Sequence, residues 1–373
     1  MKKNNKISIP LTKLQKLKLN HKKLLIIIII LLAILAILLF IPKNKVDNNT
    51  TDNINNNSNN KENNTEIKNE ETNNKDDELN VYDVKSNKRP YAVMIPNDSE
   101  AKKRQYGINK AYLTYEITVE GSITRLLALF KDVNVEKIGP VRSSRHYYLD
   151  YALENDAIYV HFGWSPQAES DISSLKINNL NGIYNPSNMF WRDKNYNSPN
   201  NAFTSTENIE KAANKKDYRT TSDSYELLNY SKNVTLENDP TMENANTVKI
   251  HYTSKTYVKY KYDETNKYYL RYNNENKHID NLENEQVHVK NIIILKMSNI
   301  DISGDAKGRQ NLNNLGSGDG YYITEGKSIK ITWNKDKRTD KTILKNSNGE
   351  EIKVNDGNTF IQIQPSKQNL ILE

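Results

Sequence analysis

The chain has 373 residues, enough for two ordinary domains once a tail and a linker are set aside. Its net charge of +7 arises in the first 23 residues, which hold eight lysines and no acid, so 7 − 8 leaves −1 for the rest. A near-neutral body argues against counterion release on DNA or RNA, and we expect no nucleic-acid partner. The lack of cysteine excludes disulfides, thiolate metal sites and a lipid-modified N-terminal cysteine.

An unbroken apolar run follows the basic tail of residues 1–23. Residues 24–41 read LLIIIIILLAILAILLFI, and at about 1.5 Å per residue they span roughly 27 Å, close to the thickness of the hydrocarbon core. The positive-inside rule places the lysines in the cytoplasm and everything after Lys43 outside. A cleaved signal peptide is the alternative, but the run is longer than a signal core and no A-x-A-like site follows it. The sequence therefore predicts an uncleaved transmembrane anchor in the cell membrane.

The next segment, residues 42–80, is dominated by Asn, Asp, Glu, Thr and Lys. Such a composition buries too little apolar surface to offset the entropy of ordering, so it predicts a disordered linker. About 37 residues of flexible chain give a typical span of roughly 30–37 Å, so the linker would hold the body away from the membrane.

Strand and helix patterns alternate over residues 81–225, which predicts a mixed α/β domain. The expected strands are 91–95, 111–120, 123–130 and 157–161, and the expected helices are 142–155 and 165–175. A turn at Gly121 and Ser122 joins two of these strands into a hairpin, and Ser165 followed by Pro166 is a typical helix start.

After a polar stretch, residues 246–368 show only β patterns, with alternating aromatic and β-branched residues separated by Gly- and Asn-rich turns. They predict an all-β domain. The predicted fold class is therefore α+β and multi-domain: a transmembrane helix, a disordered linker, a mixed α/β domain and an all-β domain.

Arginine is concentrated in the predicted α/β domain. The chain has 43 lysines and only 10 arginines, yet six arginines lie between Arg89 and Arg192. Arginine grips carboxylates and phosphates with a planar fork that lysine lacks. We therefore expect Arg125, Arg142 and Arg145 to bind a ligand, although buried ion pairs of structural importance explain the pattern equally well.

Two acids are candidates for catalysis. Glu116 and Glu120 are four residues apart on a predicted strand, so both would lie on one face. Glu120 adjoins the turn, where a side chain reaches a cleft, and a carboxyl among apolar neighbours can act as a general acid. The alternative for either residue is an ion pair with one of the arginines.

Other polar residues are expected around the same cleft. The segment Gly139 to Arg145 reads as a turn entering a helix, which suits an anion. His161 ends a predicted strand and is a candidate ligand contact, although a lone histidine is more often structural. The remaining candidates are Thr124, Arg192 and Asn200 as ligand contacts and Asp193 as a second catalytic carboxylate. No metal-binding or nucleotide motif is present, so we expect neither a metal nor a cofactor.

Several ordered motifs resemble one known family. They are RPYAVMIPN (89–97), YEITVEGSITRLLALF (115–130), KIGPVRSSRHYY (137–148), DAIYVHFGWSPQA (156–168), FWRD (190–193), SPNNAFTS (198–205), NLGSGDGYYITEGKSIKITW (314–333) and TFIQIQP (359–365). On these motifs the chain resembles the YerB-like proteins, membrane-attached surface proteins of Gram-positive bacteria that are often lipoproteins. The resemblance covers residues 86–368 and implies the same layout and location. The chain departs from it by lacking a lipobox cysteine and by carrying Ser122 and Trp164 where relatives often have glycine.

Two functions follow as hypotheses for an extracytoplasmic envelope protein. In the first, the α/β domain cleaves peptidoglycan glycan strands as a lytic transglycosylase, with Glu120 as the acid and Glu116 or Asp193 as a second carboxylate in a hydrolase variant. In the second, the same cleft binds an envelope glycan or protein without catalysis. The sequence leaves the oligomeric state open.

Overall fold

The computed structural model describes residues 79–83, 86–185, 188–222 and 226–373. The predicted tail, the anchor at residues 24–41 and nearly all of the linker lie outside this range and stay predictions. Within the described ranges, no helix is both long and apolar enough to cross a bilayer. The described residues all belong to one compact unit, in which three α-helices accompany a large β-rich part.

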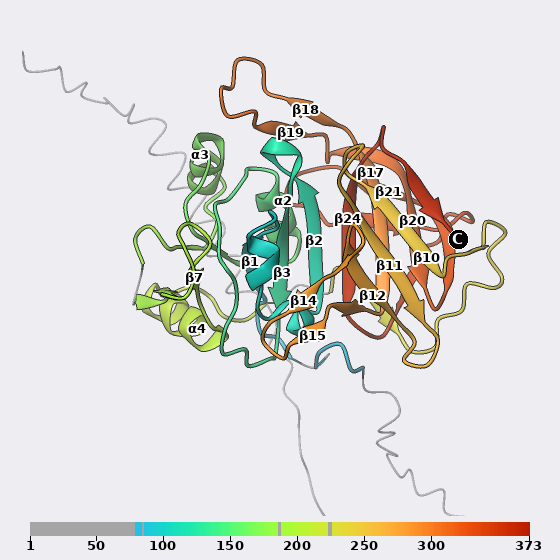
Figure 1. The fold of residues 1–373 in the computed structure, drawn as a ribbon, viewed down its shortest axis with the longest axis horizontal. Coiled ribbons are helices and arrows are strands. Elements are labelled where there is room, and N and C mark those ends of the chain that lie inside the picture. The colour runs from blue at the N-terminus through green and yellow to red at the C-terminus, as the bar shows by residue number, and fades with distance from the viewer. Residues whose placement is uncertain (1–78, 84–85, 186–187, 223–225) are drawn as a thin grey trace, which may run out of the picture. The chain divides into compact units, whose positions relative to one another are not determined.

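An eleven-stranded sheet runs through the whole body (Figure 1). Its order is β22 (Ile343–Lys345), β21 (Lys327–Lys335), β20 (Gly316–Thr324), β17 (Asn291–Met297), β24 (Thr359–Pro365), β2 (Leu113–Thr118), β3 (Thr124–Phe130), β1 (Tyr91–Pro96), β4 (Ile158–His161) and β5 (Asn179–Asn181), with β9 (Glu243–Asn244) beside β21. Strand β24 pairs in parallel with both β17 and β2. The mixed α/β part and the β-rich part are therefore both present as expected, but they share one sheet instead of each having its own.

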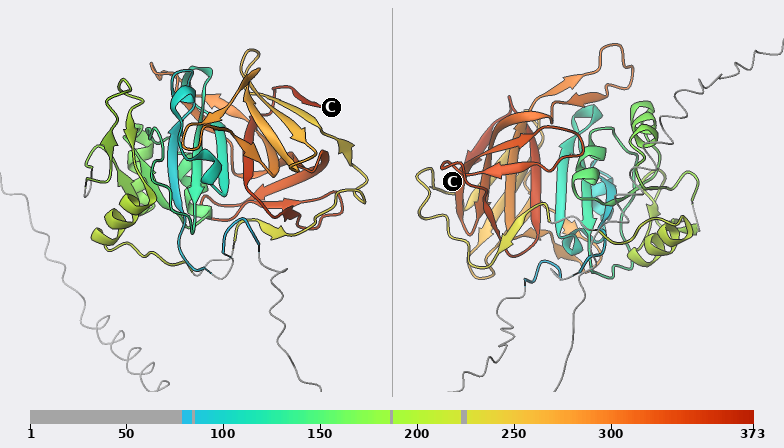
Figure 2. Two further views of the ribbon diagram at one scale, coloured as in Figure 1. Left: turned by 60° about the horizontal axis from the view of Figure 1, so that its bottom comes forward. Right: turned by 180° about the vertical axis from the view of Figure 1, so that it is seen from behind.

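A six-stranded sheet packs on the β-rich end of the large one (Figure 2). It contains β13 (Asn276–Lys277), β12 (Tyr268–Asn273), β11 (Tyr257–Asp263), β10 (Thr247–His251), β25 (Leu370–Leu372) and β16 (His288–Val289). Four two-stranded pairs complete the β structure: β14 (Ile279–Asp280) with β15 (Glu285–Gln286), β18 (Asn299–Asp301) with β19 (Gln310–Leu312), β8 (Asn229–Ser231) with β23 (Lys353–Asn355), and β6 (Trp191–Arg192) with β7 (Ala202–Phe203).

The large sheet has a hydrophobic cluster on each face because successive side chains of a strand point to opposite sides. Along β1, Ala92 and Met94 belong to one cluster, and Val93 and Ile95 belong to the other. Helix α2 (Tyr148–Glu154) packs in the first cluster, whereas α4 (Thr206–Lys215) and the six-stranded sheet pack in the second. Both faces of the central strands are therefore buried, which explains their nearly continuous apolar sequence.

Two local predictions have different outcomes. Helix α3 (Pro166–Ser174) begins as expected, with the Ser165 hydroxyl accepting a hydrogen bond from the Ala168 amide at 3.3 Å. The helix predicted over 142–155 is shorter, because α2 begins only at Tyr148. Residues 142–144 bond to other segments instead: the Arg142 amide donates to the Met94 carbonyl, and the Ser144 amide donates to the Gly163 carbonyl. These bonds to neighbouring strand ends compete with the helical ones, so no helix begins in the segment from Gly139 to Arg145, where the sequence predicted one.

Candidate functional site

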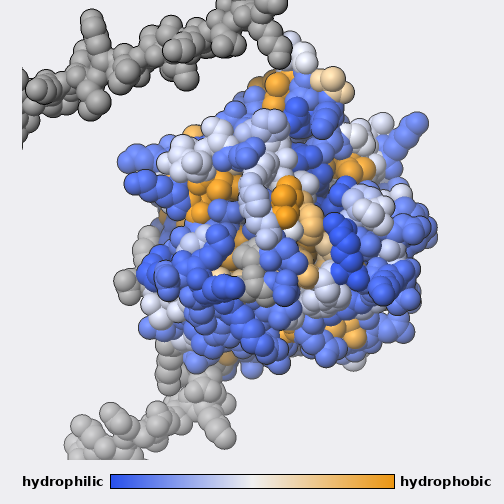
Figure 3. Space-filling model, turned by 90° about the vertical axis from the view of Figure 1, so that its left-hand side faces the viewer, coloured by the Kyte–Doolittle hydropathy of each residue, from blue (hydrophilic) through white to orange (hydrophobic). Residues whose placement is uncertain are grey.

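The carboxyl ends of three parallel strands meet at one edge of the large sheet. β1 pairs in parallel with β4, and β4 pairs in parallel with β5. Residues that follow these strands, including Asp98, Phe162 to Trp164 and Ile183, therefore gather at one edge, which is where open α/β sheets most often bind ligands. Figure 3 views the molecule from the side of α3 and α4 and shows hydrophobic patches within a mostly hydrophilic surface.

A pocket of about 330 Å³ opens at this edge. We call it the arginine pocket, and its walls include Arg142, Ser143, Phe162, Trp164, Ile183 and Arg192. The predicted residues Arg142 and Arg192 thus face one cavity. Phe162, Trp164 and Ile183 supply apolar walls, a combination typical of sites that bind an organic anion.

Arg142 is held in the pocket mainly through its backbone. Its amide and carbonyl bond to Met94 and Phe162, which fixes the start of the side chain. The side-chain Nε is buried, and none of the described residues accepts a hydrogen bond from it. Burial lowers the pKa of the guanidinium, while the charge of Asp98 opposes that shift. A charged donor without an acceptor is costly, so an anionic ligand would stabilise this arrangement.

Arg192 contributes a second guanidinium from β6. It donates to Asn201 Oδ1 at 2.6 Å and lies over the Phe162 ring, 4.9 Å from the ring centroid. Gly182 makes room for that ring, because a Cβ at position 182 would approach Phe162 to 2.2 Å. The hairpin and the strand end therefore position Arg192 jointly.

Glu120, Arg125 and Arg145 form an ion-pair cluster behind Arg142. Glu120 accepts from Arg125 Nη2 at 3.1 Å and from Arg145 Nε at 2.9 Å, with a further contact to Arg145 Nη2. Arg125 also donates to the Ser143 carbonyl, and Arg145 donates to the Ser144 carbonyl at 2.8 Å. The side chains of Arg125 and Arg145 are only 6% and 11% exposed. The cluster therefore fixes the backbone at Ser143 and Ser144, directly after Arg142.

The protonation of Glu120 follows from these contacts. Partial burial by itself would raise the pKa of its carboxyl. The hydrogen bond from Arg145 and the charges of Arg125 and Arg145 outweigh that effect, and the pKa is lowered. Glu120 is consequently ionised at neutral pH, whereas a general acid must hold a proton. The geometry thus disfavours the general-acid role expected for Glu120.

The local charges do not balance. Arg125, Arg142 and Arg145 interact with one another through space, and burial together with this mutual repulsion lowers the pKa of Arg125. The nearby negative charges are those of Glu120 and Asp98. The three guanidiniums of Arg125, Arg142 and Arg145 thus outnumber these two carboxylates, and an anionic ligand would reduce their mutual repulsion.

Glu116 lies in a different environment from Glu120. Its side chain is 1% exposed and accepts from Arg271 Nη2 at 2.7 Å. Asn97 and Thr124 donate to its other oxygen at 2.9 and 2.7 Å. Because β2 ends at Thr118, Glu120 has already left the strand, and the expectation that the two acids share a face of one strand fails. Glu116 and Thr124 form a buried link between the α/β part and the six-stranded sheet.

The other predicted residues are separate from the arginine pocket. Asp193 pairs with Lys137 at 2.8 Å and is only slightly exposed. Asn200 donates to Asp98 at 3.1 Å from a buried position. His161 is fully buried, with Nδ1 2.8 Å from the Gly163 carbonyl and Nε2 3.1 Å from Asn179 Oδ1. Burial lowers the pKa of His161 to about 4, so the ring is neutral and orients the loop after β4.

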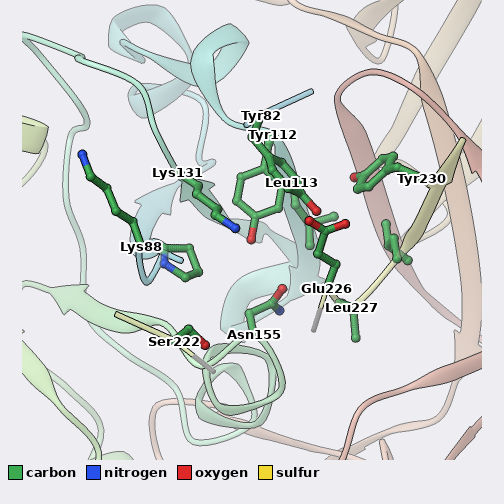
Figure 4. Close-up of a pocket in the computed structure, with 12 residues that line it drawn as sticks. Tyr82, Lys88, Tyr112, Leu113, Lys131, Asn155, Ser222, Glu226, Leu227 and Tyr230 are labelled. Carbon is green, nitrogen blue, oxygen red and sulfur yellow. The ribbon is translucent and has the colours of Figure 1, made fainter. Parts of the chain in front are cut away.

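A second cavity, near the start of β2, is much smaller (Figure 4). Lys131 and Glu226 point into it beside Tyr82 and Tyr112, whereas the amine of Lys88 points away. Its volume of about 40 Å³ accommodates about three water molecules, too few for a sugar or peptide. Across the described ranges, no group of three or more His, Asp or Glu is arranged to hold a metal ion.

The sequence analysis missed several residues of this region. Asp98, Ile183 and Arg271 were not singled out, although Ile183 follows a short buried strand in the same way that Trp164 follows β4. The position of Ile183 just after a strand could therefore have identified it as a residue of the candidate site. The pairing of Arg271 with Glu116 spans 155 positions, and no local pattern indicates it.

The comparisons agree with this architecture. Residues 78–219 match the protein of unknown function (DUF3048) N-terminal domain, and residues 248–361 match the DUF3048 C-terminal domain. The chain is 31% identical over 281 residues to "Putative lipoprotein YerB" of Bacillus subtilis, covering 74% of this chain and 82% of that protein. The crystal structure of YerB from Bacillus subtilis superposes with a TM-score of 0.68 at 28% identity, covering 77% and 94% of the two chains. The chain belongs to the YerB-like family of DUF3048 proteins.

Proposed function

We propose that this protein is attached to the membrane at the cell envelope and binds the carboxylates of peptidoglycan through the arginine pocket, without cleaving the glycan. The lipoprotein description of its Bacillus subtilis relative supports envelope attachment. The predicted anchor at residues 24–41 and the linker at residues 42–80 supply the attachment and the reach.

The observation that carries the proposal is the state of Arg142. Its guanidinium lies in a pocket with aromatic walls, and its buried Nε has no acceptor among the described residues. A ligand carboxylate at the part of the guanidinium that lines the pocket would form a charge-assisted hydrogen bond and balance the excess charge of the cluster. Peptidoglycan carries such carboxylates on its peptide stems and on those muramic acid units from which the stem has been removed, since an attached stem converts the lactyl carboxylate into an amide.

Binding is favoured over cleavage by the same contacts. A lytic transglycosylase needs a protonated carboxyl, but two arginines hold Glu120 ionised. Glu116 is buried in an ion pair with Arg271, and Asp193 forms an ion pair with Lys137 outside the pocket. None of the three expected catalytic carboxylates therefore combines access to the pocket with the protonation that glycosidic cleavage needs.

The test is co-sedimentation of the full-length protein, in detergent, with purified sacculi. Arg142→Gln removes the charge-assisted bond, which is worth about 10- to 100-fold in affinity. Arg309→Gln is the matched control, because Arg309 pairs with Asp305 near the β18–β19 hairpin. We expect weak binding for the first variant and native binding for the control; equal binding by all three proteins would overturn the proposal.

Two kinds of sacculi separate carboxylate from phosphate recognition. One preparation keeps its wall teichoic acid, and the other is stripped of it with hydrofluoric acid. The proposal predicts that stripped sacculi still bind the native protein. Binding that disappears with the teichoic acid would show that phosphate is the ligand and would contradict the assignment to peptidoglycan.

A further inference from the structure

Another pocket, of about 490 Å³ and distinct from the small cavity near the start of β2, adjoins the arginine pocket. We call it the aromatic pocket, and its walls include Trp164, Lys176, Asn179, Asn181, Tyr184 and Lys216. Trp164 lines both pockets, while the consecutive residues Ile183 and Tyr184 line one each. The two cavities are thus neighbours on either side of one wall at the carboxyl ends of β4 and β5.

The wall carries exposed aromatic surface. The rings of Trp164 and Tyr184 have centroids 5.8 Å apart and are tilted by 51°. Tyr184 is 71% exposed and Ile183 is 58% exposed, the two largest exposures among the large hydrophobic residues described. Large apolar side chains that gather at the rim of a cavity mark a binding surface. Flat aromatic faces suit the C–H face of a sugar ring, because the ring hydrogens meet the negative π face.

Asn181 adds a polar contact to this pocket. It is 4% exposed, and its Oδ1 accepts from the amides of Gly163 and Ile183, both at 3.0 Å. Its Nδ2 has no hydrogen-bond partner among the described residues. The two amide bonds fix the orientation of the side chain, and Asn181 is one of the residues that line the cavity. A carbonyl oxygen of a ligand, such as that of an acetamido group, would complete its hydrogen bonds.

We infer that the aromatic pocket is a second subsite, which takes the N-acetylated sugar next to the unit whose carboxylate binds Arg142. This inference rests on the proposed function. A ligand that fills both pockets is elongated and passes over Trp164, so the site recognises at least a disaccharide of the glycan strand. The two exposed cations of the aromatic pocket, Lys176 and Lys216, tolerate further negative charge along the strand.

The test compares two defined ligands by calorimetry on the full-length protein. One is N-acetylmuramic acid, which carries the carboxylate alone; the other is N-acetylglucosaminyl-N-acetylmuramic acid, which adds the neighbouring sugar. A second sugar that stacks and accepts one hydrogen bond should tighten binding about tenfold or more. Equal affinity of the native protein for both ligands would refute the second subsite and leave the proposed function intact.

Two variants locate the effect. Asn181→Asp keeps an oxygen that accepts from the two backbone amides but removes the Nδ2 donor. Tyr184→Ala removes one of the two aromatic rings on which the sugar would stack and adds no charge. Both should abolish most of the disaccharide's advantage. Tyr184→Ala should leave the affinity for N-acetylmuramic acid unchanged, whereas the negative charge added by Asn181→Asp should weaken the binding of this anionic ligand as well. Arg142→Gln should lower the affinity for both ligands by the same factor. If neither ligand binds the native protein, the proposed function itself fails, and if both variants retain the full advantage, the subsite is not where we place it.

Discussion

Replacing Glu120 with glutamine tests the ion-pair cluster that supports the arginine pocket. The substitution keeps the shape of the side chain but removes the charge that compensates Arg125 and Arg145. Leaving a buried charge without its partner costs about 3–5 kcal/mol. Glu120 is itself 23% exposed, so water and salt screen part of the interaction, and we expect a loss of about 2 kcal/mol in the free energy of unfolding.

The pH dependence of this loss distinguishes an ion pair from a protonated acid. The folded-state pKa of Glu120 is lowered, so its stabilising effect is present above the unfolded pKa and is lost as the pH falls through the folded pKa. The difference between the native protein and Glu120→Gln should therefore be complete at pH 7 and shrink below about pH 4.5.

Urea unfolding of both proteins at several pH values measures this difference. Glu100→Gln is the control, because Glu100 pairs with Lys103 and Arg104 at an exposed position and should leave the unfolding midpoint unchanged. A protonated general acid at position 120 would instead have a raised folded-state pKa, so the native protein would lose stability relative to Glu120→Gln as the pH rises from about 4.5 to 7. That result, or no loss of stability in the variant, would refute the reasoning.

Three further predictions concern the surroundings of the site. Gly182→Ala should lower the free energy of unfolding by about 1–3 kcal/mol, measured in urea, because its Cβ would approach the Phe162 ring to 2.2 Å; unchanged stability would contradict this. Glu116→Gln should cost about 3–5 kcal/mol, because Arg271 is fully buried and would lose its counter-charge; a small effect in the same assay would show that the pair is dispensable. His161 should stay neutral in the folded protein down to about pH 4, as an NMR titration of its ring would show. The unfolded chain takes up this proton near pH 6.5, so the free energy of unfolding should decrease as the pH is lowered from 6.5 to 4. The His161→Gln variant should not show this part of the decrease.

Local patterns in the sequence were sufficient for most individual elements. The apolar segment that predicted a strand over 123–130 and the Ser165–Pro166 start of α3 both correspond to the structure. The helix predicted over 142–155 was too long, because residues 142–144 bond to the ends of β1 and β4 and leave the helical conformation. Such competition depends on strands that lie elsewhere in the chain, so periodicity within the segment could not reveal it.

The candidate site was predictable in composition but not in pairing. The concentration of arginines predicted either a ligand site or buried ion pairs. Arg125 and Arg145 form ion pairs. Arg142 lines a pocket, and its Nε has no acceptor among the described residues, so ligand binding stays a prediction. Strand alternation placed Glu116 and Glu120 together, yet Glu120 lies in the turn after β2. The partner of Glu116 comes from the six-stranded sheet, which only the fold brings near.

The most direct test of binding without cleavage is one incubation of the full-length protein with sacculi, followed by two readings. The pellet is assayed for bound protein, and the supernatant is analysed by mass spectrometry for soluble muropeptides. The account predicts protein in the pellet and no fragments in the supernatant. Anhydro-muropeptides released by the native protein, and absent with Glu120→Gln, would contradict it and would restore Glu120 as a catalytic acid.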